Sequence, residues 1–426
     1  MNTPQSPSVL RSFRIVADPA LEPSVRALLE SEGFRFEPEP FSPLCWRLTC
    51  EPFPLGSSLA AFFGYVYIQD RSSMLPPLAL APEEGATVVD MCSSPGSKTG
   101  LLAQLVGRTG FVLANELSHS RLSTLRMTLQ TCNAVQVGTC SYSGDRLPLR
   151  PGSCRYIMLD PPCSGWGTVE KNPHVMDVWR ESKVKPLIQL QQSLLARAAE
   201  LLAPGGTVVY STCTTNSDEN ERQVEFAERE LGLVRDPVTP FPGFYWDDRT
   251  GSEGTLRVDG EKSRAQGFYV ARLRKPSCAV CPDSADAEGG SGLSFWGGGS
   301  VSRAALASAT LDPALLPAGC CGVFSGTVRF LPEAAMAFLP EKFVWQGAPL
   351  GRLSGGGFQA DARLRVFMRP NALSLVLESV AEVRALLSGA ARKCALSGKE
   401  AGLWLGDLPL GRVSLRQGRV IAGFGR

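Results

Sequence analysis

The sequence predicts a doubly wound α/β fold over residues 76–276, in which helices cover both faces of a parallel sheet. Two observations predict it. Apolar runs alternate with helix-like segments along this whole stretch, as in consecutive strand–helix–strand units. The runs are also apolar at nearly every position, which is typical of strands buried on both faces.

Five apolar runs are predicted as the strands of this sheet. They are "ATVVDMC" (86–92), "GFVLANE" (110–116), "AVQVGTC" (134–140), "YIMLDPPC" (156–163) and "TVVYSTC" (207–213). The helix-like segments between and after them are "SKTGLLAQLVG", "SHSRLSTLRMTLQTC", "KPLIQLQQSLLARAAELL" and "SDENERQVEFAERELG". A further strand is expected at "GFYVARLRK" (267–275), near the end of the fold.

Composition shifts divide the rest of the chain. Residues 1–75 predict a small N-terminal α/β unit, with "LRSFRIVAD" as a strand and "PSVRALLESEG" as a helix that ends at Gly33. Residues 277–299 are rich in Gly, Ser and acidic residues, so we expect a flexible linker there. Residues 300–426 mix one helix-like segment with short strands and predict a compact, β-rich domain.

The composition is that of an ordinary globular protein, with 44% hydrophobic and 20% charged residues in 426. No apolar run reaches the roughly 18 residues that span a bilayer, and the N-terminus lacks the layout of a secretory signal. The thirteen cysteines are therefore expected as thiols. We expect a cytoplasmic protein that does not bind membranes and acts as a monomer.

Positive charge is concentrated toward the C-terminus. Residues 291–426 hold fifteen Lys and Arg against eight Asp and Glu, while the whole chain has a net charge of +2. The segment from position 408 to the end of the sequence contains Arg412, Arg416, Arg419 and Arg426 and no acidic residue. A local basic surface attracts phosphates, although a solvated face with excess arginine explains the pattern equally well.

The loop in "DMCSSPGSKTG" (90–100) joins a predicted strand to a predicted helix. Its Gly, Ser and Pro residues let a ligand approach the backbone closely. It matches neither the phosphate-binding GxxxxGK[ST] loop nor GxGxxG. Glu116 follows the next strand, where an acid accepts hydrogen bonds from ribose hydroxyls or is simply an exposed acid. Together they favour a nucleoside cofactor without a pyrophosphate.

Two cysteines follow predicted strands. Cys163 lies in "LDPPCSGWGTVEKNP" (159–173) beside Asp160, and Cys213 lies in "STCTTNSDEN" (211–220). Most free cysteines are small core residues. Ligands bind at the carboxyl ends of strands in open α/β sheets, however, so two cysteines placed there indicate reactive thiols. No metal site is predicted, because "CAVC" (278–281) and "CC" (320–321) have no second CxxC and the chain has two histidines.

Four of these motifs resemble, in their order, those of the S-adenosylmethionine-dependent RNA cytosine-5 methyltransferases, the Sun/Fmu family. They are "DMCSSPGSKTG", "LDPPCSGWGT", "YSTCTTNSDENE" and "GFYVARLRK", and "YIQDRSSMLPPLAL" (67–80) is similar to the segment that precedes the fold in that family. The N-terminal unit and the basic tail with "LWLGDLPLGRV" resemble the bacterial 16S rRNA member that carries a C-terminal PUA-like domain. Ser93, Ser94 and Ser97 stand where the family more often has Ala, Ala and Gly.

The resemblance implies a methyltransferase that modifies carbon 5 of a cytosine in RNA through a covalent bond from a cysteine to carbon 6. It implies Cys213 as the nucleophile, Cys163 as the residue of proton removal and release, and Asp160 as the residue that orients the base. The implied partner is ribosomal RNA or the small-subunit particle. The residues implied to hold S-adenosylmethionine are Cys92, Ser93, Ser94, Pro95, Gly96, Ser97, Lys98, Glu116, Asp145 and Asp160.

Two other classes of protein are weighed against this one. A DNA cytosine-5 methyltransferase would use the Pro-Cys cysteine, here Cys163, as its nucleophile and would lack "STCTTN". A non-catalytic ribosome-assembly factor would be expected to have lost Cys213 or the cofactor loop. Both are present, so the sequence favours the RNA enzyme.

Overall fold

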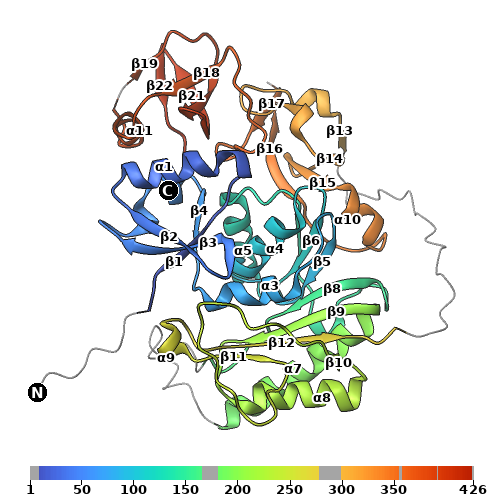
Figure 1. Ribbon diagram of the computed structural model, residues 1–426. Coiled ribbons are helices and arrows are strands. Elements are labelled where there is room, and N and C mark those ends of the chain that lie inside the picture. The colour runs from blue at the N-terminus through green and yellow to red at the C-terminus, as the bar shows by residue number, and fades with distance from the viewer. Residues whose placement is uncertain (1–8, 166–180, 278–298, 355–356, 391, 425–426) are drawn as a thin grey trace, which may run out of the picture.

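The computed structural model describes residues 9–165, 181–277, 299–354, 357–390 and 392–424. Its centre is one mixed sheet with the strand order β10-β12-β9-β8-β5-β6-β7, and β11 pairs with β12 (Figure 1). The five predicted strands run parallel to one another, whereas β12 is antiparallel to β9. The doubly wound α/β class predicted from the sequence is confirmed.

The bounds of the elements follow the predicted runs. The strands are β5 (Thr87–Asp90), β6 (Phe111–Asn115), β7 (Val137–Cys140), β8 (Cys154–Leu159), β9 (Leu202–Thr212), β10 (Val234–Arg235), β11 (Leu256–Val258) and β12 (Phe268–Arg274). The helices are α3 (Leu75–Leu80), α4 (Ser97–Val106), α5 (His119–Thr131), α7 (Glu181–Leu201), α8 (Glu221–Leu231) and α9 (Gly260–Ser263). Among the described residues, no helix is long and apolar enough to cross a membrane.

Alternate residues of the parallel strands enter two separate cores, which explains why the runs are apolar throughout. Val88 and Val112 pack with α3, α4 and α5, whereas Val89 and Phe111 pack with α7 and α8 on the other face. No α-helix lies between β7 and β8, where the chain forms only the short 3-10 helix Gly144–Arg146. There α10 (Glu333–Phe338), which belongs to the C-terminal part of the chain, covers the sheet instead.

The N-terminal residues form a four-stranded antiparallel sheet in the order β2-β3-β1-β4. Its strands are β1 (Ser12–Ile15), β2 (Arg35–Glu39), β3 (Ser42–Cys50) and β4 (Val66–Ile68), and its helices are α1 (Glu22–Ser31) and α2 (Leu59–Phe62). The buried Arg14 of β1 donates to Gln69 and to the carbonyl of Ser97 at the start of α4. This contact ties the N-terminal sheet to the cofactor loop predicted from the sequence.

Residues 299–424 form two five-stranded sheets, where the sequence suggested one β-rich module. The first contains β13 (Ser300–Val301), β14 (Gly319–Phe324), β15 (Thr327–Pro332), β16 (Ala348–Ser354) and β17 (Gly357–Ala360). The second contains β18 (Ser374–Leu377), β19 (Arg392–Lys393), β20 (Glu400–Leu405), β21 (Leu408–Arg416) and β22 (Arg419–Ile421), with α11 (Val380–Leu387) beside it. The predicted linker lies outside the described residues, apart from its ends.

Both sheets are packed onto the rest of the molecule. The second shares a core with the N-terminal unit, where the Tyr65 hydroxyl donates to the carbonyl of Pro409. The first contacts the edge of the central sheet, because Thr139 and Gln346 exchange two backbone hydrogen bonds of 2.8 Å. The buried Arg365 donates to the carbonyls of Gly64 and Thr131 and so joins all three parts.

Candidate active site

The predicted site residues lie in loops that leave the carboxyl edge of the parallel strands. The strand order reverses between β5 and β8, and ligands of open α/β sheets bind at such a reversal. The loop after β5 holds residues 92–98, and the loop after β8 holds Asp160 and Cys163. Glu116 follows β6, and Cys213 follows β9. The fold therefore brings residues that are far apart in the sequence to one edge.

The loop after β5 is held closed by short-range hydrogen bonds. The Ser93 amide donates to the carbonyl of Asn115, and the Gly96 amide donates to the carbonyl of Ser93 at 2.8 Å. Gly96 has φ +103°, and a Cβ there would lie 3.1 Å from Leu125 and Thr128. A side chain at position 96 would be strained, so glycine is required for α4 to begin at Ser97.

Asp90 ends β5 directly below this loop and was not assigned a role from the sequence. Its carboxylate is buried and accepts a hydrogen bond of 2.7 Å from the Thr99 hydroxyl. Burial raises the pKa of the Asp90 carboxyl to about 6, although the Thr99 hydrogen bond acts in the opposite direction. Asp90 therefore stabilises the folded protein best when it is protonated.

This pKa predicts a pH dependence of stability. Because the folded-state pKa exceeds the unfolded one, the contribution is complete below about pH 4 and is lost as the pH rises through about 6, a loss of about 3 kcal/mol. Asp90→Asn removes the titration, so its unfolding free energy relative to wild type should rise by that amount between about pH 4 and 7. Urea unfolding at both pH values measures it. The exposed Asp248→Asn is the control, and an equal change in both variants would refute the assignment.

Asp160 is held between two residues at the centre of the edge. Its Oδ2 atom pairs with Lys98 Nζ at 2.7 Å, and its Oδ1 atom accepts from the Ser211 hydroxyl at 2.9 Å. Burial acts to lower the pKa of the Lys98 amine, but the Asp160 carboxylate outweighs it and leaves this pKa raised. Lys98 is thus a fixed positive charge beside the carboxylate.

The two cysteines meet beside this ion pair. Cys163 Sγ and Cys213 Sγ are 3.3 Å apart and share a hydrogen bond. That hydrogen bond lowers the pKa of the Cys213 thiol, and the charge of Lys98 adds to the effect against burial. The pKa of Cys163 is raised well above its usual value by the same contact and by burial. The arrangement favours a Cys213 thiolate that accepts a hydrogen bond from the Cys163 thiol.

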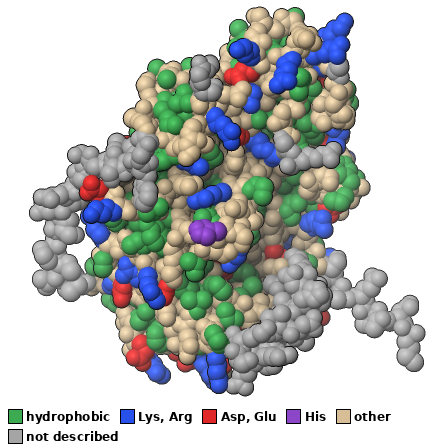
Figure 2. All heavy atoms as spheres, turned by 180° about the vertical axis from the view of Figure 1, so that it is seen from behind, with side chains coloured by type: hydrophobic (Ala, Val, Ile, Leu, Met, Phe, Trp, Pro, Cys, Tyr) green, Lys and Arg blue, Asp and Glu red, His purple; other side chains and the backbone are tan. Residues whose placement is uncertain are grey.

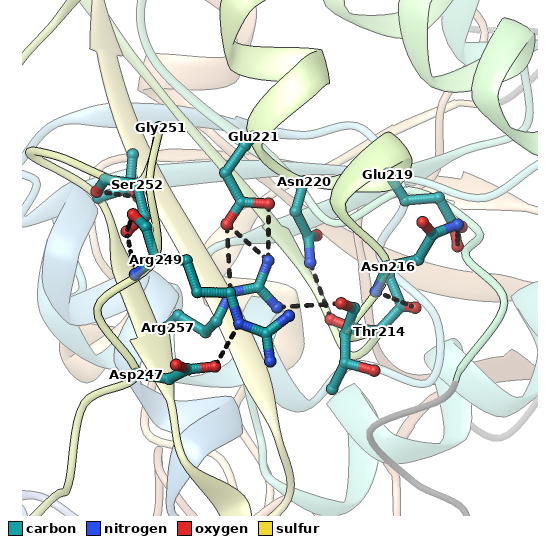
Figure 3. Close-up of polar contacts among 12 residues, drawn as sticks. Thr214, Asn216, Glu219, Asn220, Glu221, Asp247, Arg249, Gly251, Ser252 and Arg257 are labelled. Carbon is teal, nitrogen blue, oxygen red and sulfur yellow. Dashed lines mark hydrogen bonds and ion pairs between the residues drawn. The ribbon is translucent and has the colours of Figure 1, made fainter.

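Glu219 joins the two cysteine loops and was missed in the sequence. Its buried carboxylate accepts from the amide and the hydroxyl of Ser164, the residue after Cys163. It also accepts from the Asn216 amide in the loop that follows Cys213, and from Gln191 of α7. Figure 3 shows Glu219 and Asn216 pointing toward each other across this loop. One side chain therefore fixes the position of both loops.

A second group of polar residues supports the Cys213 loop from its other side (Figure 3). Arg257 of β11 pairs with Glu221 at 2.5 Å and donates to the carbonyl of Thr215, and both side chains of the pair are buried. Asn220 donates to the carbonyl of Thr214. The polar segment "TTNSDENE" is typical of the start of a helix and can be recognised in the sequence. No motif near Arg257 indicates that this residue supports the Cys213 loop.

The residues predicted for the cofactor surround the loop after β5. Burial raises the pKa of Cys92, and the charges of Asp90, Asp160 and Glu116 add to this effect. Arg121 pairs with Glu116 at 3.6 Å and donates to the carbonyl of Ser94.

Asp145 lies in the turn Gly144–Arg146 after β7, where its carboxylate accepts from the Ser143 hydroxyl. Asn115 connects the two regions, because its side-chain amide donates to the carbonyls of Met91 and Tyr142. His174, the end of "LDPPCSGWGTVEKNP" and "CAVC" lie outside the described residues. Within the described ranges, no three His, Cys, Asp or Glu side chains form a group that could hold a metal ion.

Comparison with known proteins gives a family match over the central sheet. Residues 77–274 match the family described as 16S rRNA methyltransferase RsmB/F. The chain is 36% identical over 266 residues to a ribosomal RNA small subunit methyltransferase F from Shewanella amazonensis, covering 59% of this chain and 55% of the relative. A Cronobacter sakazakii protein of the same name is 37% identical over 252 residues, covering 57% and 52%. The chain thus spans about half the length of these curated relatives.

A solved structure supports the assignment. The methyltransferase homolog protein from Pyrococcus horikoshii is 31% identical, with a TM-score of 0.54, and the match covers 63% of this chain and 87% of that protein. The matched family segment, residues 77–274, contains the central sheet, all four loops of the candidate site and both facing cysteines. The chain belongs to the 16S rRNA methyltransferase RsmB/F family.

Proposed function

We propose that this chain is an S-adenosylmethionine-dependent methyltransferase that modifies carbon 5 of a cytosine in RNA, with small-subunit ribosomal RNA as the substrate. The observation that carries the proposal is the pair Cys163 and Cys213, whose sulfurs lie 3.3 Å apart beside the Lys98–Asp160 ion pair. Family membership supports methyl transfer to RNA. The two thiols support the cytosine-5 reaction in particular.

The residues around the loop after β5 fit a nucleoside that carries an amino-acid group. The loop turns at Gly96 into α4, the N-terminus of α4 favours a carboxylate, and Glu116 can accept from ribose hydroxyls. Residues 92–98, Glu116, Asp145 and Asp160 would hold S-adenosylmethionine. When bound, this cofactor supplies an electrophilic methyl group.

The chain's own residues then activate the base. Carbon 5 of cytosine is a poor nucleophile, but addition of the Cys213 thiolate to carbon 6 makes the ring enamine-like, so that carbon 5 can take the methyl group. Asp160 hydrogen-bonds the base near N3 and the exocyclic amine, which favours this attack. Its fixed position between Lys98 and Ser211 suits that role.

Release requires a proton to leave carbon 5. Its electron pair then re-forms the double bond between carbons 5 and 6 and expels the Cys213 thiolate. Once Cys213 is bonded to the base, Cys163 loses its proton to solvent, and the resulting thiolate, 3.3 Å from the Cys213 sulfur, takes the proton from carbon 5. The second strand-end cysteine, Cys213 in "STCTTN", argues against the order used by DNA cytosine-5 methyltransferases, in which Cys163 would attack.

Bisulfite sequencing of total RNA, with and without the gene, tests the proposal. We expect a cytosine in small-subunit ribosomal RNA to be protected from conversion only when the gene is present. Complementation with the Cys213→Ala variant should not restore protection, while the exposed Asp248→Asn variant should restore it. Identical conversion of every cytosine in both strains would refute the proposed function.

A further inference from the structure

A cleft separates the edge of the central sheet from the C-terminal sheets, away from the loops that carry the cysteines. It has a volume of about 580 Å³ and lies between α5 and β7 on one side and β15, β16, β17 and β21 on the other. This volume is within the range of roughly 300–1,000 Å³ that is typical of ligand sites. Its polar lining includes Arg126, Thr139, Arg329, Arg352, Gln359 and Arg412.

The charge of the cleft is strongly positive. Four arginines line it against one acid, Asp361, and that carboxylate is engaged by the Gln130 amide at 2.9 Å. Arg412 has a distant partner in Glu400, at 3.6 Å. Within the described ranges, Arg126, Arg329 and Arg352 have no acidic partner. A partly buried guanidinium without a counter-charge is costly, so this cleft is suited to an anion.

Two of these arginines are held in place with donors to spare. Arg126 Nε donates to the Thr139 hydroxyl at 3.0 Å, and Arg329 Nη1 donates to the carbonyl of Gly347 at 3.0 Å. Each guanidinium has five N–H donors, so several remain for a ligand. Both guanidinium groups line the same cleft, and the positive charge of Arg126 adds to the effect of burial in lowering the pKa of Arg329. An anion between them would relieve this repulsion.

The walls of the cleft are fixed relative to each other. The backbone pairing of Thr139 with Gln346 joins β7 to the segment before β16. At the other end, the Asn133 side chain donates to the carbonyl of Arg363 and accepts from the Arg365 amide. Val135 also packs into the core of the first C-terminal sheet. The site is therefore preformed, and binding an anion there does not require the two parts to close.

We propose that this cleft binds a phosphodiester group of the RNA substrate, through Arg126 and Arg329 and with Arg352 at its mouth; the identity of the anion as RNA rests on the proposed function. Guanidinium groups bind phosphate oxygens through paired N–H donors. Figure 2 shows several Lys and Arg side chains, with few acids between them, on the upper part of the molecule as it is seen from behind. A chain of phosphates could follow that surface, whereas an isolated small anion would gain nothing from it.

Substitution in the full chain tests the site, because residues 300–424 share cores with the rest and cannot be removed cleanly. The test measures the affinity for a labelled single-stranded RNA at increasing salt concentration. S-adenosylmethionine is left out, so that RNA binding is measured separately from methyl transfer. For Arg126→Gln with Arg329→Gln, the slope of log K against log salt should fall in magnitude by about 0.7, the value for one lost phosphate contact on a single strand. Arg126→Lys with Arg329→Lys should retain most of the slope.

The matched control is Arg155→Gln with Arg229→Gln, which removes the same charge from side chains that are 65% and 76% exposed. This control should keep the wild-type slope. An equal loss in both pairs would overturn the proposal, because only net charge would then matter. Two other results would also overturn it. In the first, Arg126→Gln with Arg329→Gln abolishes the stabilisation of the protein by inorganic phosphate but leaves RNA binding unchanged. In the second, the variant abolishes stabilisation by poly-glutamate and again leaves RNA binding unchanged.

Discussion

Cys213→Ala is expected to abolish methyl transfer and every covalent protein–RNA species, whereas Cys163→Ala should accumulate a covalent adduct. The reason is the division of work between the two sulfurs, which lie 3.3 Å apart. Without the Cys213 thiolate, no bond to carbon 6 can form and carbon 5 stays unreactive. Without Cys163, attack and methylation proceed, but the step that expels Cys213 is slowed.

Denaturing electrophoresis of each variant after incubation with S-adenosylmethionine and substrate RNA measures this. A slowly migrating band is expected for Cys163→Ala, and none for Cys213→Ala. If the cysteines were only packing residues, both variants would lose some stability and neither would form a band. A band in Cys213→Ala alone would reverse the roles and make Cys163 the nucleophile.

Glu219→Gln is expected to reduce kcat by about a hundredfold with a small effect on KM, since misplacing reacting groups by about 1 Å costs that much. The Glu219 carboxylate accepts hydrogen bonds from Ser164, Gln191 and Asn216. A glutamine has one acceptor oxygen and an amide group that would face donors. The two cysteine loops would therefore shift relative to each other.

Alkylation of Cys213 by iodoacetamide over a range of pH separates this positioning role from simple destabilisation. The contact with Cys163 lowers the pKa of Cys213, so loosening the contact should move the alkylation profile to higher pH. The exposed Glu225→Gln on α8 is the matched control and should keep the wild-type profile. An unchanged profile in Glu219→Gln, with kcat reduced, would contradict the positioning role.

The central sheet could be predicted because each strand carries its own signal. The runs at 86–92, 110–116 and 134–140 are buried on both faces, and β5, β6 and β7 fall within them. The direction of β12 had no such signal, since pairing direction depends on the neighbour rather than on the strand itself. The packing of α10 on the central sheet could not be predicted either. This helix takes the place of a crossover helix between β7 and β8, although it lies about 190 residues further along the chain.

The loop residues of the site could be predicted from the sequence, but the buried residues that hold these loops in place could not. Cys163, Cys213 and Asp160 follow strands and so could be assigned to one edge. Glu219 and Arg257 could not, because a buried charged residue has the same appearance in sequence as an exposed one. Their roles come from partners such as Ser164 and Glu221 that the fold alone brings near.

Release of tritium from RNA labelled at carbon 5 of cytosine tests the central claim most directly, since methylation at that carbon displaces its hydrogen. The wild-type protein with S-adenosylmethionine should release tritium to water in step with methyl incorporation. Cys213→Ala should do neither. Methyl incorporation by the wild type without tritium release would place the methyl group on another atom and contradict the account.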